Sequence, residues 1–436
     1  MSRVRRSLGR TFGSLRASRN FRLYVFGQLI SAAGTWINAT ALAWLVLRLT
    51  DSGIALGVTT ALLFLPMLLF GAWGGVLADR FDKRRILLYT QSAFAIIAAV
   101  LWVLVASDRI DLWMVYVLSF TNGIVTAVDN PTRQSFYVEM VGEEALTNAV
   151  SLFSAAFTGA RIVGPAIAGI LISTAGIAVC FLVDAVSYVA VLIALWMIRP
   201  AELFPQARST REKGHLMAGL RYVWRTDELR RPLIVMAVIF TLSFNFSVLV
   251  PLLAQRTFGG DAGTFGALSA LGGFGSFAAA LVMANRNAAP TMRRFGLFAA
   301  AAGVTQVMVA VSPTLDWALA AMAGVGATMM IFMITANTML QLRAVPQARG
   351  RVMALYGIVF LGSTPIGSPI AGWVAQHLGT RATGPRIGFA LGGAVALAMG
   401  LGVLARLRAR AVHADGDRAA DADPAQGLRG TATSSG

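Results

Sequence analysis

Polar side chains recur at helical spacing inside long apolar stretches of this chain, and their chemical types limit what they can do. Steps of three or four residues place the members of each set on one helix face. The three polar stripes are Gln28, Ser31, Thr35 and Asn38; Ser119, Asn122, Thr126 and Asp129; and Asn148, Ser151, Thr158 and Arg161. Amides, hydroxyls and a guanidinium can bind a solute, but small polar groups also bond one helix to another. The candidate substrate-cavity residues among them are Gln28, Thr35, Asn38, Asn122 and Arg161.

Arg161 is the most informative of these residues, because apolar-rich sequence flanks it on both sides and keeps its guanidinium from a headgroup. A charge at the centre of a bilayer costs at least about 2.5–3.5 kcal/mol, so such residues usually face a partner or a cavity. The candidate partner is Asp184, in the next apolar segment. Two interpretations stay open: a salt bridge that joins two helices, and a functional charge in a cavity.

A second candidate wall lies in the C-terminal part of the chain, where Phe244, Asn245 and Met333 fall in apolar segments with few charges. Met and Phe side chains can re-pack around variable apolar ligands, although a plain packed core is the simpler interpretation. A cavity that is polar on one wall and soft on the other would suit an amphipathic organic molecule.

Catalytic and metal chemistry find little support in the sequence. The single cysteine, Cys180, excludes an internal disulfide and any multi-cysteine metal site, and only three histidines are present. No Ser/His/Asp set and no nucleotide-binding motif is visible, and glycine-rich stretches such as 272–275 lie inside apolar segments. We therefore expect no enzyme, no cofactor and no metal site.

The elements that must position the polar residues are membrane-spanning helices. The composition is 56% hydrophobic, and about 20 apolar residues are needed for a helix to cross a bilayer. A bilayer cannot hydrogen-bond exposed backbone, so apolar runs of this length must be helical. Twelve such segments are predicted, at residues 24–48, 53–77, 86–106, 112–132, 147–173, 177–198, 233–255, 264–284, 295–312, 316–339, 352–376 and 385–405. The expected fold class is an all-α membrane protein with twelve transmembrane helices.

The basic residues orient this bundle. With the N-terminus in the cytoplasm, 31 of the 37 Lys and Arg residues fall in the tails and in alternate loops on that side. The positive-inside rule therefore predicts that both termini are cytoplasmic. In this interpretation the net charge of +17 arises from the basic residues that fix the orientation in the membrane. No nucleic-acid partner is therefore expected.

The chain divides into two six-helix halves. We expect a basic cytoplasmic tail at 1–22, an N-terminal half at 23–198, a cytoplasmic linker at 199–232, a C-terminal half at 233–406 and a disordered tail at 407–436. The halves repeat each other weakly: residues 163–169 read VGPAIAG and residues 367–372 read GSPIAG. Internal repeats of this kind build many transporter folds, with the substrate site near the midplane where the halves meet.

The residues after the second apolar segment carry a resemblance to a known family. Residues 75–85 read GVLADRFDKRR, which resembles the cytoplasmic loop motif of major facilitators, with Asp82 in place of the usual second glycine. Within that superfamily the chain is similar to the third drug/proton antiporter group, which includes enterobactin exporters and macrolide efflux proteins. The resemblance implies a latch in which Asp79 faces a helix terminus of the other half and basic residues reach Asp129. The implied latch residues are Gly75, Asp79, Arg80, Lys83, Arg84 and Asp129.

A second motif of the same group supports the resemblance. Gly164, Pro165 and Gly169 resemble its exporter motif, with Ala168 where a glycine is usual. The arginine of helix four found in many proton antiporters is absent, so proton coupling is implied by the resemblance but not located. The candidates are Asp184, which lies well inside an apolar segment, and Asp129.

The sequence therefore predicts a secondary transporter of a bacterial inner membrane that exports a small amphipathic, drug-like compound by alternating access. The expected partners are the small-molecule substrate, protons and the lipid bilayer. We expect a monomer. One alternative is a dedicated siderophore or natural-product exporter of the same fold. A second is a membrane receptor or scaffold that does not transport, which would be expected to lack the loop motif and the mid-depth polar residues.

Overall fold

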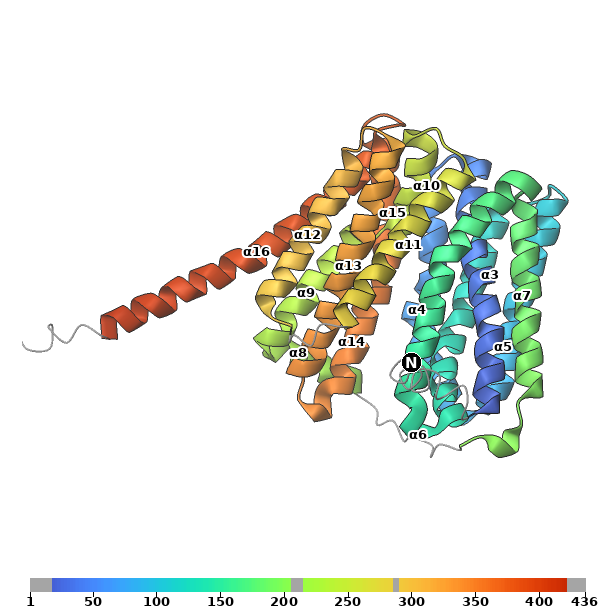
Figure 1. The fold of residues 1–436 in the computed structure, drawn as a ribbon, viewed down its shortest axis with the longest axis horizontal. Helices are drawn as coiled ribbons and strands as arrows, with labels where there is room; N and C mark the ends of the chain where they lie inside the picture. The colour runs from blue at the N-terminus through green and yellow to red at the C-terminus, as the bar shows by residue number, and fades with distance from the viewer. Residues whose placement is uncertain (1–17, 205–214, 285–289, 422–436) are drawn as a thin grey trace, which may run out of the picture.

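A computed structural model describes residues 18–204, 215–284 and 290–421, and nearly all of them are helical, arranged as two helical halves side by side (Figure 1). The N-terminal half contains α3 (Arg19–Thr50), α4 (Gly53–Arg80), α5 (Lys83–Ala106), α6 (Leu112–Ala175) and α7 (Ile177–Met197). Within α6, Gly142 has a φ of 72° and separates two spanning segments, Leu112–Gly142 and Asn148–Ala175. This half therefore supplies six spanning segments.

The C-terminal half follows a linker that contains the short helix η1 (Pro200–Glu202) and α8 (His215–Arg225). Its helices are α9 (Asp227–Leu242), α10 (Phe246–Leu252), the π-helical η2 (Leu253–Thr257), α11 (Ala262–Ala284), α12 (Met292–Ala310), α13 (Leu315–Arg343), η3 (Pro346–Ala348), α14 (Arg349–Gly362), α15 (Thr364–His377) and α16 (Gly384–Asp421). The seventh segment comprises α9, α10 and η2, and the eleventh comprises α14 and α15.

The predicted all-helical fold with twelve spanning segments is confirmed. In the described residues, eleven helical spans are long and apolar enough to cross a membrane. The remaining predicted segment, 295–312, is α12, which has 19 residues and carries arginines in its first turn. One boundary differs from expectation: α16 continues to Asp421, so residues 407–421 are helical, whereas a disordered tail was expected from residue 407. Residues 1–17, 205–214 and 422–436 of the expected tails and linker lie outside the described residues.

Short polar side chains begin several helices by accepting hydrogen bonds from backbone N–H groups that the helix leaves free. Ser18 caps α3 and Ser52 caps α4 in this way. Asp82 caps α5, because its carboxylate accepts a bond from the N–H of Arg85 at 3.0 Å. This cap explains why an aspartate can stand where the family motif has a glycine.

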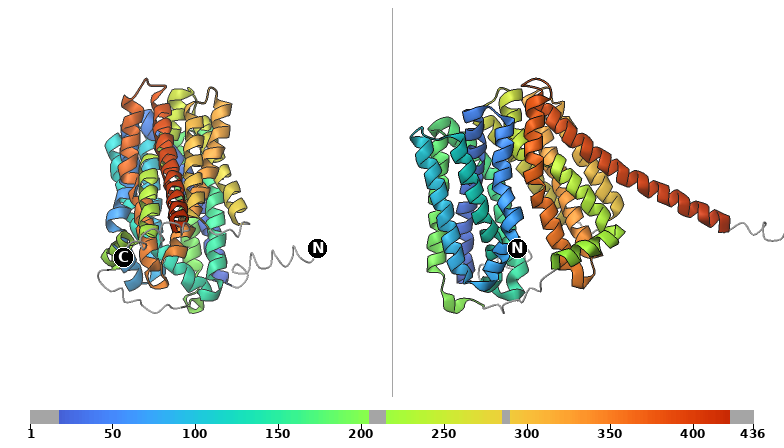
Figure 2. Two further views of the ribbon diagram at one scale, coloured as in Figure 1. Left: turned by 90° about the vertical axis from the view of Figure 1, so that its left-hand side faces the viewer. Right: turned by 180° about the vertical axis from the view of Figure 1, so that it is seen from behind.

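Two ends of the molecule can be told apart. We call the end that carries the α4–α5 loop the latch end, and the end that carries the α3–α4 loop the Asp51 end. Figure 2 shows the helices of the two halves converging at the Asp51 end and separating toward the latch end. The last part of α16 projects away from the other helices (Figure 2).

Small residues allow helices within each half to approach backbone to backbone. A Cβ atom added at Gly326 of α13 would lie 1.8 Å from the carbonyl oxygen of Gly272 in α11, and one at Gly275 would lie 1.9 Å from that of Ala323. Close approach through glycine and alanine is typical of membrane helices, because packing rather than a hydrophobic driving force joins helices in lipid.

Gly326→Ala is therefore expected to destabilise the protein by about 1–3 kcal/mol, the usual cost of overpacking. Gly402→Ala is the matched control, because a Cβ at Gly402 would meet nothing within 4 Å, while the gain in helix propensity of about 1 kcal/mol is common to both. Thermal unfolding in detergent should give a melting temperature for Gly326→Ala below those of the control and the wild type. Equal melting temperatures for the two variants would contradict this packing argument.

Candidate functional site

The two halves contact each other through two pseudo-symmetric glycine seams. In the first, α4 packs against α15: a Cβ at Gly372 would lie 2.1 Å from the carbonyl oxygen of Gly53. In the second, α6 packs against α11: a Cβ at Gly169 would lie 2.9 Å from the carbonyl oxygen of Ala262. Gly169 and Gly372 close the two repeated motifs, so each copy of the repeat forms one seam.

The exporter motif thus lies at the contact between the halves. Pro165 supports it, because a Cβ at Gly266 of α11 would lie 2.5 Å from the carbonyl oxygen of Pro165. Gly164 has a different role: its absent side chain makes room for Trp36 of α3, whose Cβ would lie 2.4 Å from a Cβ at Gly164.

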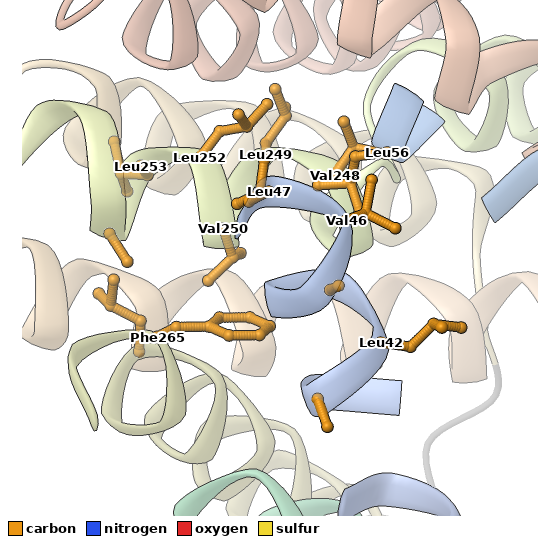
Figure 3. Packing of buried hydrophobic residues seen from close by; sticks show 14 of the residues in the cluster. Leu42, Val46, Leu47, Leu56, Val248, Leu249, Val250, Leu252, Leu253 and Phe265 are labelled. Atoms are coloured by element: carbon orange, nitrogen blue, oxygen red, sulfur yellow. The ribbon is translucent and has the colours of Figure 1, made fainter. Parts of the chain in front are cut away.

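An apolar cluster built from both halves extends the contact at the Asp51 end (Figure 3). Buried side chains of α3 and α4 meet those of α10, η2 and α11 there, and the residues labelled in Figure 3 are Leu42, Val46, Leu47, Leu56, Val248, Leu249, Val250, Leu252, Leu253 and Phe265. Trp44 also stacks on Phe265 across the halves, with ring centroids 6.4 Å apart. The cluster holds α3 and α4 against α10, η2 and α11 at this end.

A polar network caps the cluster. The guanidinium of Arg256 is only 5% exposed and pairs with the carboxylate of Asp51 at 3.5 Å. It also donates to the backbone carbonyls of Asp51 and Ala375. Arg381 pairs with the other carboxylate oxygen of Asp51 at 2.7 Å. Ser52 of α4 also donates to the side-chain oxygen of Gln376 in α15 at 2.9 Å, which adds a further bond between the halves at this end.

At the latch end, the basic residues of the loop motif bind within their own half. Lys83 pairs with Glu139 of α6 at 2.5 Å. Arg84 donates to the carbonyl oxygens of Leu195 at 2.7 Å and Trp196 at 2.9 Å, near the end of α7. The expectation that Lys83 and Arg84 reach Asp129 is therefore wrong, because nearer acceptors on α6 and α7 hold both side chains.

Asp129 is fully buried and its carboxylate is already satisfied. One oxygen accepts hydrogen bonds from Thr90 at 2.7 Å and Gln91 at 2.8 Å, and the other pairs with Arg133 one turn along α6. Of the remaining latch residues, Gly75 is buried, Asp79 is half-buried and Arg80 is exposed. No hydrogen bond of the Asp79 side chain is found in the described part of the chain, so the latch is not engaged with the other half.

Asp184 and Arg161 do not form the salt bridge that was one of the two expectations. The carboxylate of Asp184 is 2% exposed and accepts a bond from the Asn38 side chain at 2.5 Å, while its second oxygen is buried with no donor. The guanidinium of Arg161 instead lies over the ring of Trp36, 5.4 Å from its centroid. Asp184 faces α3 from α7, and Arg161 faces α3 from α6, so the helix stands between them.

The other candidate cavity residues differ in how much of their surface is exposed. Gln28 is buried and donates to the Tyr24 hydroxyl at 3.1 Å. Asn245 is buried and accepts a bond from Ser368 at 3.4 Å. Thr35 remains exposed, and Asn38 and Asn122 are half-buried. Gln28 therefore bonds within α3, whereas Asn245 links the start of α10 to α15.

The apolar wall of the cavity that was predicted in the C-terminal half is an aromatic cluster. Phe244 contacts Phe240, Phe246 and Phe360, with ring centroids 5.3–5.8 Å apart, and Met333 packs beside the same core. Phe244 and Met333 are half-buried, so they retain accessible surface beside this core.

Several partners were missed by sequence reasoning. Arg133 stands four residues after Asp129, a spacing that joins opposite charges on a helix, so this pair was open to prediction. Glu139, Trp36 and the pairing of Asp51 with Arg256 had no such local signal, because their partners are remote in sequence. Within the described residues, no three His, Cys, Asp or Glu side chains converge as a metal site would require.

Comparison with known proteins identifies the family of this chain. The family described as transmembrane secretion effector, within the major facilitators, matches residues 10–429. The chain belongs to this family. It is a multi-pass membrane protein of a transporter family, as the loop motif and the repeat predicted.

Three relatives indicate the range of the family. The chain is 30% identical to the staphyloferrin A transporter of Staphylococcus aureus over 57% of this chain and 63% of that protein, which is less than two thirds of its length. It is 28% identical to the multidrug efflux pump Tap of Mycolicibacterium fortuitum over 83% of this chain and 90% of that one. It is 27% identical to macrolide efflux protein A of Streptococcus pyogenes over 54% and 58%.

Solved structures share the fold at low sequence identity. The nucleoside transporter NupG is similar with a TM-score of 0.71 at 11% identity, covering 89% of this chain and 98% of that chain. A bacterial homologue of the human lysosomal transporter Spinster is similar with a TM-score of 0.66 at 14% identity, covering 88% and 95%. These likenesses confirm the two-half helical architecture.

Arg256→Gln is expected to shift the protein away from the state closed at the Asp51 end. The guanidinium makes charge-assisted bonds across the halves, each worth about 1.5–3 kcal/mol, so the closed population should fall by about tenfold or more relative to the open one. Spin labels at Arg109→Cys and Val311→Cys, two exposed positions at this end in opposite halves, would report the change in a Cys180→Ala background.

Arg381→Gln is the matched control, because Arg381 pairs with the same carboxylate but is 68% exposed, and exposed pairs contribute only about 0–1 kcal/mol. The label-to-label distance should lengthen clearly in Arg256→Gln and little in Arg381→Gln. An unchanged distance distribution in Arg256→Gln would show that this network does not hold the end closed.

Proposed function

We propose that this protein exports a small amphipathic organic compound across the bacterial cytoplasmic membrane by alternating access. The observation that carries the proposal is the asymmetry between its two ends. Two glycine seams, an apolar cluster and the Arg256 network join the halves at the Asp51 end, while the loop motif at the latch end bonds only within its own half. Relatives named for multidrug and macrolide efflux support the direction.

The latch end faces the cytoplasm in this proposal. Most Lys and Arg residues of the described part of the chain lie in loops and helix ends at that end, as the positive-inside rule requires, and both termini are then cytoplasmic. The structure would correspond to the state that opens inward, and the protein would work as a monomer, because each half supplies one copy of the seam.

Asp79 completes the cycle in this proposal. Closing the latch end would bring the end of α4 toward the start of α14 at Arg349, a helix N-terminus of the other half. A carboxylate is stabilised at a helix N-terminus by the unpaired N–H groups and the helix dipole. The outward-open state would thus gain a contact that the present structure lacks.

Asp79→Asn is accordingly expected to reduce transport by about tenfold or more, as the loss of a charge-assisted contact worth about 1.5–3 kcal/mol implies. Asp82→Asn is the matched control three residues away, because asparagine caps a helix about as well as aspartate. Efflux of dyes, macrolides, tetracyclines and catecholates would be measured in cells with and without the protein, with membrane levels equalised. Wild-type efflux by Asp79→Asn would remove the latch from the mechanism.

A siderophore or natural-product exporter is the second candidate. The similarity to the staphyloferrin A transporter favours it, and the catecholate arm of the same screen separates it from a general drug pump. A receptor or scaffold without transport would change the accumulation of none of these compounds.

We further propose that protons drive export and that Asp184 carries them. One of its carboxylate oxygens is held by the Asn38 amide, and the other is buried without a donor, so that oxygen can hold a proton. Asp129, the other candidate, has both oxygens occupied by Thr90, Gln91 and Arg133. Asp184 is thus the better placed of the two.

Asp184→Asn should abolish substrate-dependent proton release from proteoliposomes while leaving substrate binding intact, because the amide keeps the size of the side chain but cannot exchange a proton. Asp111→Asn is the control, since Asp111 is exposed at a loop and its side chain caps nothing. Asp129→Asn should instead lower thermal stability, since breaking a buried pair costs about 3–5 kcal/mol. Intact proton-coupled transport in Asp184→Asn would place the carrier elsewhere, including on the substrate itself.

A further inference from the structure

Arg161 is a charge in the membrane-spanning part of the protein that no acidic group neutralises. It lies in the middle of the span Asn148–Ala175 of α6 and is half-buried. Among the described residues, no carboxylate lies within salt-bridge distance of it, and its one assigned interaction is with the ring of Trp36. A cation–π contact stabilises a guanidinium but leaves its net charge in place.

The packing around Arg161 explains why Asp184 does not supply the missing anion. Gly34 of α3 faces Asp184 and Ser187 of α7, and Asn38 binds Asp184 on the same side. Trp36 is two residues from each, about 200° around the helix, and faces α6. Asp184 is therefore screened from Arg161 by the body of α3.

The described neighbours of Arg161 on α11, and Asp129 on α6, do not supply the anion either. Across the seam, α11 approaches through Gly273, whose Cβ would lie 3.5 Å from the carbonyl oxygen of Arg161 and 3.1 Å from the side chain of Ile162. Farther along α6, Asp129 is occupied by Arg133. Each buried acid of the N-terminal half thus has another partner.

Aromatic side chains continue from the Arg161 contact along the same wall. Trp36 packs edge-on against Phe157 with centroids 5.9 Å apart, Phe157 stacks on Phe153 at 6.2 Å, and Phe153 contacts Tyr137 at 5.0 Å. Phe157 is 37% exposed. The indole N–H of Trp36 is buried without an acceptor, so a second donor beside the guanidinium is free.

We propose that Arg161 and Trp36 bind the anionic group of the transported compound, and that the Trp36–Phe157–Phe153 surface takes its aromatic or apolar body. The proposal rests on the proposed transport function and narrows its substrate class to amphipathic organic anions. A planar guanidinium suits a carboxylate or similar oxyanion, because it can donate two parallel hydrogen bonds to it.

The test compares two probes that differ in charge but hardly in shape, naphthalene-2-carboxylate and naphthalene-2-carboxamide. Dissociation constants would be measured by equilibrium dialysis with the purified full-length protein in detergent. The wild type should bind the carboxylate about tenfold or more tightly than the amide. Arg161→Gln should remove this preference, Arg161→Lys should keep part of it, and Trp36→Phe should weaken it.

Arg386→Gln is the matched control, because Arg386 also lies over an aromatic ring, that of Phe258 at 5.8 Å, but at the Asp51 end. It should leave the charge preference unchanged. If Arg161→Gln does not fold, the Arg161→Lys and Trp36→Phe variants still test the proposal. If the wild type shows no preference for the carboxylate, or if Arg161→Gln lowers the melting temperature and leaves the preference intact, the contact with Trp36 only joins helices and the proposal is overturned.

Uptake of both probes into proteoliposomes separates this inference from the proposed function. Transport without a charge preference would leave an exporter whose substrates are not selected by Arg161. An Arg161-dependent preference without transport would leave the anion site in place and overturn the transport function.

Discussion

The contact of two backbones at the seams between the halves is the constraint on which the rest of this structure depends. At Gly53 with Gly372, and at Gly169 with Ala262, the helices approach so closely that a single methyl group would not fit. Lipid offers no hydrophobic driving force between apolar helices, so such close packing must provide the attraction. The seam contacts themselves consist of small, uncharged surfaces, so the halves can separate at the seams without breaking a charged interaction. The pair of Arg256 with Asp51 at that end joins a buried guanidinium to a carboxylate that is 40% exposed, so water can reach the Asp51 side of the pair.

Three buried charged groups of the N-terminal half differ in how completely their partners satisfy them. These differences separate structural from functional groups. Asp129 has every oxygen occupied, which suits a group that fixes α5 against α6. Asp184 has one occupied oxygen and one free. Arg161 has an aromatic neighbour but no counter-charge. A buried charge is costly unless it is paired and hydrogen-bonded, so the incompletely satisfied groups are those on which a proton or a ligand can act.

The fold was predictable from the sequence because length and polarity alone decide it: in a bilayer, a long apolar run can only be a helix. Which polar side chains lie inside the helix bundle was predictable for the same reason, since each stands out within an apolar segment. Their partners were not, because a partner depends on which face of a neighbouring helix lies opposite. Arg161 and Asp184 illustrate this limit: they lie on successive segments at similar depth, yet α3 stands between them. The cap at Asp82 shows the opposite case, since an aspartate before a helix is a local signal that needs no knowledge of packing.

The helix α3 connects all three elements of the proposed mechanism. Its C-cap residue Asp51 binds Arg256 of the other half, Asn38 holds the carboxylate of Asp184 on one face, and Trp36 carries the guanidinium of Arg161 on another. From Trp36 to Asp51 the helix spans about 22 Å at 1.5 Å per residue, and it is continuous over that distance. A continuous helix moves as a unit, so a tilt or rotation of α3 that opens the Asp51 end must also change the surroundings of Asn38 and Trp36. Binding of an anion at Trp36 and loss of a proton at Asp184 can therefore both bias the same movement, which is what coupling of a solute to an ion requires.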